Sequence, residues 1–179
     1  MVGRHGFQLS WLLVALGLSL FSGELETADA EEDFYFDAAT PTPKAVLALQ
    51  DCDADENTPA HRKAFAGGYI FAIKCASNNE NFIETLIFSE AEDGADGWLL
   101  KFPKSPRNKD VSDTISNIRW YPKTDEIGEI FVDRESPPIC RTESRWQLEG
   151  KKRKPRLVFM RETRDCEGRG GWVVVVNKK

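Results

Sequence analysis

The sequence contains little of what catalytic and metal sites are usually built from. Of its two histidines, His61 is the only one beyond the N-terminal region, and none of its four cysteines forms a Cys-x-x-Cys pair. Structural zinc sites normally use such pairs, so no metal site and no cofactor are expected. Apart from one run near the N-terminus, no apolar stretch approaches the length of a membrane-spanning helix. We therefore expect no stable membrane span in the mature protein.

The N-terminus has the features of a cleavable secretory signal. Arg4 and His5 precede an apolar run over residues 11–21, which is too short to span a bilayer, and small residues follow at Ala28 and Ala30. A permanent N-terminal anchor is the alternative. Cleavage after Ala30 would release the rest of the chain into an oxidising compartment, which we expect to be the periplasm.

Charge is divided unevenly along the chain. Residues 31–139 carry 11 Lys and Arg against 21 Asp and Glu, whereas residues 140–179 carry 12 against 5. The simpler interpretation is a solvated surface whose two halves attract each other, and the alternative is a basic face that meets an anionic partner. The formal net charge of the whole chain is −5, so nucleic acid is not an expected partner.

Four cysteines, Cys52, Cys75, Cys140 and Cys166, are expected to form two disulfides, because their number is even and the expected compartment is oxidising. Three pairings are open. We predict pairing in order, Cys52 with Cys75 and Cys140 with Cys166, since each pair brackets short predicted elements whose ends can meet without long-range threading.

The chain predicts one mainly β domain over residues 43–179, preceded by the signal (1–30) and by an acidic, then Pro/Thr-rich flexible arm (31–42). Thr42-Pro43 is typical of a helix start, and the apolar residues after it predict one short helix that ends near Cys52. Apolar and alternating runs between polar turns predict about eight strands in an antiparallel sheet, sandwich or barrel. These runs lie at residues 69–73, 82–88, 98–102, 114–121, 127–132, 140–148, 156–161 and 172–176.

One segment matches a calcium loop only at its start. Asp51, Asp53 and Asp55 alternate as calcium ligands do, but Glu56 stands where the loop needs glycine and Arg62 stands where it needs a bidentate glutamate. A polar turn with solvated carboxylates is expected instead.

His61 is the natural candidate for a general base. No serine nucleophile motif surrounds it, and the cysteines are expected to be oxidised, so no thiolate is predicted. No pair of carboxylates is singled out by its spacing as a glycosidase pair would be. A surface histidine is expected, and no catalytic residue is assigned.

The strongest charge run is Lys151-Lys152-Arg153-Lys154, with Arg156 close behind. The segment 149–152 predicts a hairpin turn, so the run would lie at a hairpin tip. It is interpreted either as a solvated turn or as a contact for an anionic partner such as phosphate-bearing lipid or polysaccharide. Core packing is expected for the tryptophans of the predicted strands, Trp98, Trp120, Trp146 and Trp172.

A set of C-terminal motifs follows a recognisable order. It comprises residues 118–127 (IRWYPKTDEI), Cys140, Trp146, Gly150, Leu157-Val158, Cys166-Glu167-Gly168 and Trp172. Upstream lie an apolar helix ending at Cys52 and an apolar strand ending at Cys75. Together these features resemble a bacterial periplasmic family, the domain of unknown function 1176, over roughly residues 43–176. The resemblance implies periplasmic residence and pairing of the cysteines in order, and it implies no catalytic activity.

The expected function is that of an exported, non-catalytic protein that binds an envelope component or a protein partner, or supports the envelope. One alternative is an inhibitor of an envelope-attacking hydrolase such as lysozyme, because such inhibitors also tend to be exported, disulfide-bonded β proteins. The other is a cryptic hydrolase, which would need a concave site with convergent carboxylates or a network around His61.

Overall fold

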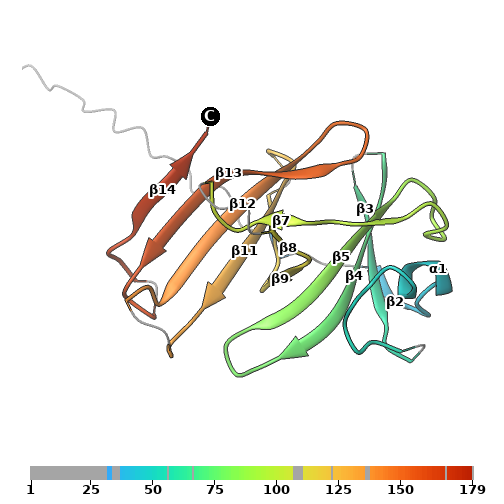
Figure 1. Cartoon of the computed structure of the whole chain (residues 1–179), viewed down its shortest axis with the longest axis horizontal. Coiled ribbons are helices and arrows are strands. Elements are labelled where there is room, and N and C mark those ends of the chain that lie inside the picture. The colour runs from blue at the N-terminus through green and yellow to red at the C-terminus, as the bar shows by residue number, and fades with distance from the viewer. Residues whose placement is uncertain are drawn as a thin grey trace, which may run out of the picture.

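The computed structural model describes residues 32–33, 37–55, 57–65, 67–106, 111–121, 123–135, 138–167 and 169–178. They form two large antiparallel sheets, one small sheet and one short helix (Figure 1). The mainly β, antiparallel class predicted from the sequence is thus confirmed, whereas closure into a sandwich or barrel stays a prediction. The predicted signal peptide lies outside the described residues, as does part of the predicted arm.

Both large sheets are built from strands that mostly follow one another in the chain. Sheet A contains, in spatial order, β1 (Glu32–Asp33), β10 (Arg119–Tyr121), β11 (Glu126–Val132), β12 (Arg141–Glu149), β13 (Lys154–Thr163) and β14 (Val173–Asn177). Sheet B contains β2 (Asp37–Thr40), β3 (Ala60–Phe65), β4 (Gly68–Ser77), β5 (Phe82–Ser89) and β6 (Trp98–Leu99), and β9 (Thr114–Ser116) also pairs with β5. The small sheet pairs β7 (Phe102–Pro103) with β8 (Val111–Ser112).

The helix is shorter than the sequence predicts. α1 covers Lys44–Leu47, and its N-cap is Pro43 instead of Thr42. The Thr42 hydroxyl donates a hydrogen bond to the carbonyl oxygen of Thr58. After Leu47, the N–H groups of Leu49 and Gln50 bond to the carbonyl oxygens three residues back, so the chain leaves the α-helical pattern before Cys52. Among the described residues, no helix has the length and apolar character needed to cross a membrane.

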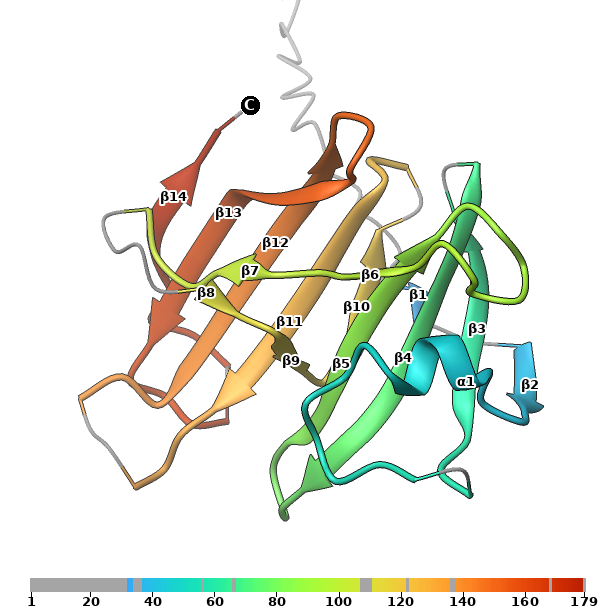
Figure 2. The same cartoon turned by 45° about the vertical axis from the view of Figure 1, so that its right-hand side comes forward.

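The main core is enclosed by sheet A, sheet B and the segment that connects the two sheets. The described residues 98–106 and 111–116, which contain β6 to β9, pass from sheet B across one face of sheet A (Figure 2). Phe102 packs edge to face on Trp146 with ring centres 5.1 Å apart, and Trp146 Nε1 donates to the Pro103 carbonyl oxygen at 2.9 Å. Trp120 meets Phe65 of sheet B at 4.5 Å. The core positions predicted for Trp120 and Trp146 are therefore confirmed.

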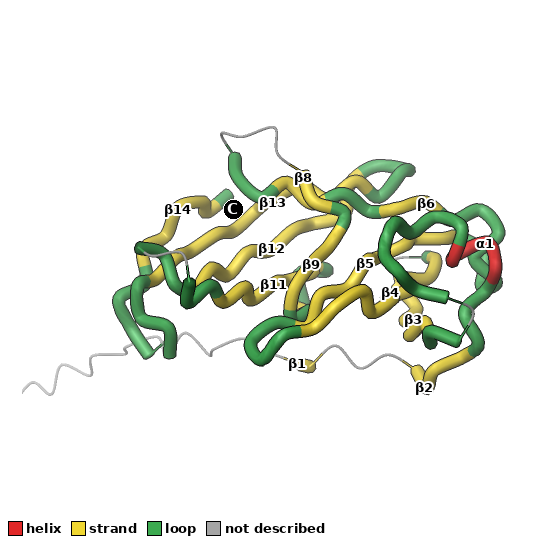
Figure 3. The backbone as a smooth tube through the Cα atoms, turned by 60° about the horizontal axis from the view of Figure 1, so that its bottom comes forward, coloured by secondary structure: helices red, strands yellow, loops and turns green. Residues whose placement is uncertain are grey.

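A second, smaller core lies on the other face of sheet B. Strand alternation points Phe71, Ile73 and Ile87 to this face, where they pack against Val46 of α1. The helix accordingly lies against sheet B at one end of the molecule (Figure 3). Both faces of sheet B are thus covered by other parts of the chain.

An ion pair with a buried carboxylate fastens the connecting segment to sheet A. Lys104 Nζ contacts both carboxylate oxygens of Glu129, at 2.8 and 2.9 Å, and the backbone N–H of Ser116 donates to the same carboxylate at 2.8 Å. The Glu129 side chain is only 4% exposed. These bonds hold the two ends of residues 104–116 on one face of β11.

Two disulfides tie irregular segments to strands, and their pairing is the predicted one. Cys52–Cys75 joins the loop after α1 to β4, and Cys140–Cys166 joins the start of β12 to the β13–β14 connection. The Cys140 backbone N–H also donates to Thr163 O at 2.9 Å. Hydrogen bonds therefore already fix the register of β12 and β13 where the second disulfide forms.

Candidate functional site

The basic run predicted as a contact lies at the tip of the β12–β13 hairpin, which confirms the predicted turn. Gly150 and Arg153 have positive φ angles of 68° and 44°. Trp98 Nε1 donates to the Lys152 carbonyl oxygen at 2.8 Å, and the Arg153 guanidinium lies 5.7 Å from the ring centre of Phe88. Half of the turn is therefore anchored on sheet B.

Arg156, the last member of the predicted contact, is neutralised by a neighbour. Its Nε atom donates to Glu149 Oε1 at 2.6 Å. Arg156 and Lys154 line an open hollow of about 640 Å³ that also includes Glu149. Lys178 also lines this hollow, so the carboxylate cancels one of three positive charges. Residues 151–153 are not part of the lining, so the structure does not bring the predicted basic run together at one site.

A second hollow, with more charged groups in its lining, lies where sheet B meets β10, β11 and β12. Its volume is about 610 Å³, and we call it the junction groove. It is lined by His61, Lys74, Glu80, Phe82, Glu84, Asn117, Ile118, Arg119, Ile130, Val132 and Arg141. Its volume is typical of a small-molecule site, and apolar side chains alternate with a few charged ones in its lining.

Strand register explains why three polar side chains of sheet B reach the groove together. His61 in β3 pairs with Ala72 in β4, and Lys74 in β4 pairs with Glu84 in β5. Side chains two residues apart point to the same face of a sheet, so His61, Lys74 and Glu84 share one face.

Two asparagines join sheet B to sheet A along the floor of the groove. Asn81 donates to Val132 O at 2.8 Å and accepts from Val132 N at 3.0 Å. Asn117 donates to Ile130 O at 2.8 Å and accepts from Phe82 N at 3.0 Å. These two side chains make the kind of hydrogen bonds between β5 and the end of β11 that the backbones of paired strands would make. They therefore fix the width of the groove.

Glu84 is the carboxyl group that the groove perturbs most clearly. Burial raises the pKa of Glu84 from its ordinary value of 4.5 to about 7, and the positive charge of Lys74 opposes part of this increase. The carboxyl is partly protonated near neutral pH. Its negative charge, and its repulsion of any anion in the groove, therefore develop as the pH rises through about 7.

Arg141 provides the groove with available positive charge. Among the described residues it is the one partly buried Arg or Lys side chain for which the structure gives neither a hydrogen bond nor an ion pair, and its Nε atom is buried without a partner. The guanidinium lies 6.0 Å from the ring centre of Trp172. A polar group in such a position gains free energy when a ligand accepts its hydrogen bonds.

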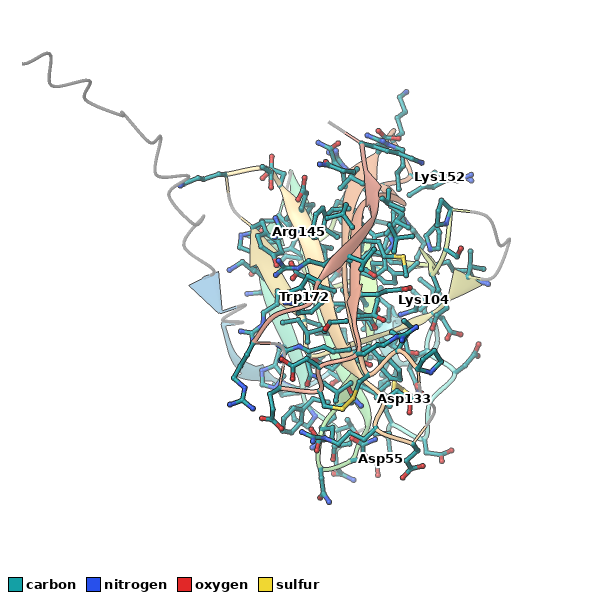
Figure 4. The ribbon with its side chains drawn as sticks, turned by 90° about the vertical axis from the view of Figure 1, so that its left-hand side faces the viewer. Asp55, Lys104, Asp133, Arg145, Lys152 and Trp172 are labelled. Atoms are coloured by element: carbon teal, nitrogen blue, oxygen red, sulfur yellow. A yellow bond between two sulfur atoms is a disulfide. The ribbon has the colours of Figure 1, made fainter. Side chains whose placement is uncertain are left out.

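Next to the groove, sheet A carries a surface that we call the arginine face: Arg141, Glu143 and Arg145 of β12, Phe159 and Arg161 of β13, with Tyr121 and Trp172. Glu143 pairs in register with Arg161, and Arg145 pairs with Phe159. Figure 4 places Arg145 and Trp172 on one side of sheet A and Lys104 on the other. Trp172 therefore lies on this outer face, and its predicted core position is wrong.

The calcium-like segment is a hydrogen-bonded turn. Asp55 Oδ1 accepts from Asn57 N at 2.9 Å, and this bond is the main reason that the pKa of Asp55 lies below its ordinary value. Among the described residues, no group of three His, Cys, Asp or Glu side chains could hold a metal ion.

Sequence reasoning missed Lys74, Glu84 and Arg141 as site residues, and it considered His61 without its neighbours. One signal was available: Glu84 is the only charged residue inside the apolar run 82–88. A charge within an apolar strand is costly unless it serves a site or a partner. That Arg141 and Glu84 line one groove could not be read from the sequence, because it depends on the junction of two sheets.

Comparisons with protein families, with curated proteins and with solved structures found no match. The resemblance to the domain of unknown function 1176 therefore stays a prediction. Support for a function rests on the geometry of the groove and of the surface next to it.

Proposed function

We propose that the protein is an exported, non-catalytic binding protein and that its junction groove binds an anionic group attached to an apolar body. The observation that carries the proposal is the partly buried Arg141 side chain in the groove lining, whose Nε atom has no hydrogen-bond partner. Lys74 adds a second cation, and Phe82, Ile118 and Val132 add apolar surface. The two disulfides support export, because such bonds persist in oxidising compartments such as the periplasm.

The pH dependence of binding should follow the protonation of Glu84. An anion next to a protonated carboxyl meets no repulsion, whereas an anion next to a carboxylate does. Other charged or titratable groups that face the groove are His61 on β3, Lys74 on β4, Glu80 in the turn before β5, and the two arginines of sheet A. Anion affinity is therefore highest below pH 7 and falls above it.

Changing Arg141→Gln is expected to weaken binding of a simple aromatic anion, benzoate, roughly tenfold or more at about pH 5.5, because a charge-assisted hydrogen bond contributes about 1.5–3 kcal/mol. Calorimetry or a ligand-observed NMR titration measures the change. Lys154→Gln, which removes the same charge from the hairpin tip, is the matched control, and benzyl alcohol is the matched neutral probe. Equal benzoate affinity in the parent and in Arg141→Gln would refute the assignment.

A second candidate function is a hydrolase, and one observation favours it. The pKa of Glu84 lies near 7, which suits a general acid or base, and His61 and Lys74 share its face of sheet B. Turnover of a substrate that is lost in Glu84→Gln, while folding and benzoate binding persist, would establish this function over simple binding.

A further inference from the structure

We propose that the arginine face extends the junction groove into a track for a linear polysaccharide that bears repeated carboxylates. The inference rests on the proposed function, because it takes the groove as one end of the binding surface. It concerns the outer face of sheet A, where Arg145 and Arg161 are 25% and 35% exposed.

The two central arginines are held in fixed positions by one buried carboxylate. Glu143, whose side chain is 5% exposed, accepts Nε and Nη2 of Arg145 at 3.2 and 3.0 Å. It accepts Nε of Arg161 at 2.6 Å and also pairs with Nη2 of that residue. A guanidinium has five N–H donors, so each arginine keeps donors for a ligand. The charge of Glu126 also acts on Arg145, so two carboxylates stand against Arg145 and Arg161, and the positive surplus of the face comes from Arg141.

Aromatic rings hold the planes of the same guanidinium groups. Arg145 lies 3.9 Å from the ring centre of Tyr121 and 4.8 Å from that of Phe159. Arg161 lies 4.3 Å from the ring centre of Trp172. Side chains restrained in this way lose little conformational entropy when they bind a ligand, so their hydrogen bonds contribute more to affinity.

Arg141 connects the face to the groove. It lines the groove, and its guanidinium also stands 6.0 Å from the ring centre of Trp172, which Arg161 contacts from β13. Arg141 and Arg145 are four residues apart on β12, a spacing of about 13 Å along an extended strand. Positive charge thus continues from the groove along β12 and across to β13.

The chemistry of the face favours one kind of occupant. Guanidinium forks match planar carboxylates in a bidentate manner. An acidic peptide binds a sheet most readily at an edge, where backbone groups are available, whereas this face presents side chains only. A linear chain of sugar acids offers carboxylates at regular intervals, and its sugar rings can rest on the partly exposed rings of Phe159 and Trp172.

The test measures affinity for oligogalacturonates as a dimer, a tetramer and an octamer, at about pH 5.5 and low salt. For the parent, we expect a gain of roughly tenfold or more from dimer to octamer, because added carboxylates reach more arginines within one chain. The gain should shrink as salt screens the charges. In Arg161→Gln the gain is expected to disappear while dimer affinity stays, whereas Arg141→Gln loses both. Arg156→Gln, which lies outside the arginine face, is the matched control.

A measurement on the unmodified protein tests the proposal even where a variant fails to fold. The Nε–H signal of Arg161 should shift in the NMR spectrum with the octamer and stay in place with the dimer. Dimer binding without any gain on lengthening would overturn the track and leave the groove intact. Absence of binding by all lengths and by benzoate would overturn both proposals. Equal affinity for an oligoglutamate with the same number of carboxylates would overturn the polysaccharide as the occupant.

Discussion

Replacing Glu129 by alanine is expected to lower the free energy of unfolding by about 2–3 kcal/mol, because it leaves a buried backbone N–H and a partly buried ammonium without their acceptor. Glu129 is the acceptor both for Lys104 Nζ and for the backbone N–H of Ser116. After the change, the Lys104 ammonium would lie near sheet A without a counter-charge, and Ser116 N would lose its acceptor. Urea denaturation followed by tryptophan fluorescence measures the loss.

Two further variants separate the contributions at this ion pair. The double variant Lys104→Met with Glu129→Leu should lose less stability than the sum of the two single changes, since it removes both charges together. Glu149→Ala breaks the exposed pair with Arg156 and is the matched control, with an expected cost below about 1 kcal/mol. A loss below about 1 kcal/mol in Glu129→Ala would mean that the connecting segment is held by other contacts.

Changing Asn117→Ala is expected to cost about 3 kcal/mol and to deform the junction groove, because the variant loses several side-chain hydrogen bonds at once. Asn117 donates to Glu80 O at 3.0 Å and to Ile130 O at 2.8 Å, and it accepts from Phe82 N at 3.0 Å. Its φ angle of 47° lies in the left-handed region, which alanine adopts at a cost. Denaturant unfolding and benzoate titration report the two effects.

Asn117→Gly divides this loss into its two causes. Glycine adopts a positive φ freely but offers no side-chain hydrogen bonds, so it should recover only the conformational part, about 1 kcal/mol. Asn57→Ala, in the exposed turn next to Asp55, is the control for loss of an asparagine elsewhere. Full stability and full benzoate affinity in Asn117→Ala would show that the asparagines do not set the groove.

Local patterns in the sequence predicted most of the longer strands and, through a glycine among charged residues, the turn at Gly150. They missed β3, and the run 114–121, predicted as one strand, is divided between β9 in sheet B and β10 in sheet A. The cysteines bracket neighbouring elements, and pairing in order follows from that. The helix was predicted too long at its C-terminal end: after Ala48 the backbone bonds run only three residues back, although apolar residues continue to Leu49.

The candidate site could not be predicted in the same way, because it depends on how two sheets meet. The four basic residues at 151–154 are consecutive in the sequence, yet the hairpin turn does not bring them together at one site. Arg145 and Arg161 are separate in sequence, yet strand register brings both to Glu143, and Arg141 lies on the same strand face. The alternation Arg141-Thr142-Glu143-Ser144-Arg145 is the one local sign of a charged strand face.

The most direct test of the groove as an anion site is the titration of Glu84 itself. The carboxyl carbon signal of Glu84, followed by NMR with and without benzoate, gives its pKa in both states. We predict a pKa of about 7 in the free protein, well above the ordinary 4.5. Bound benzoate should raise this pKa further, because binding and protonation favour each other by linkage. A Glu84 pKa near 4.5, or one that benzoate leaves unchanged, would contradict the proposal.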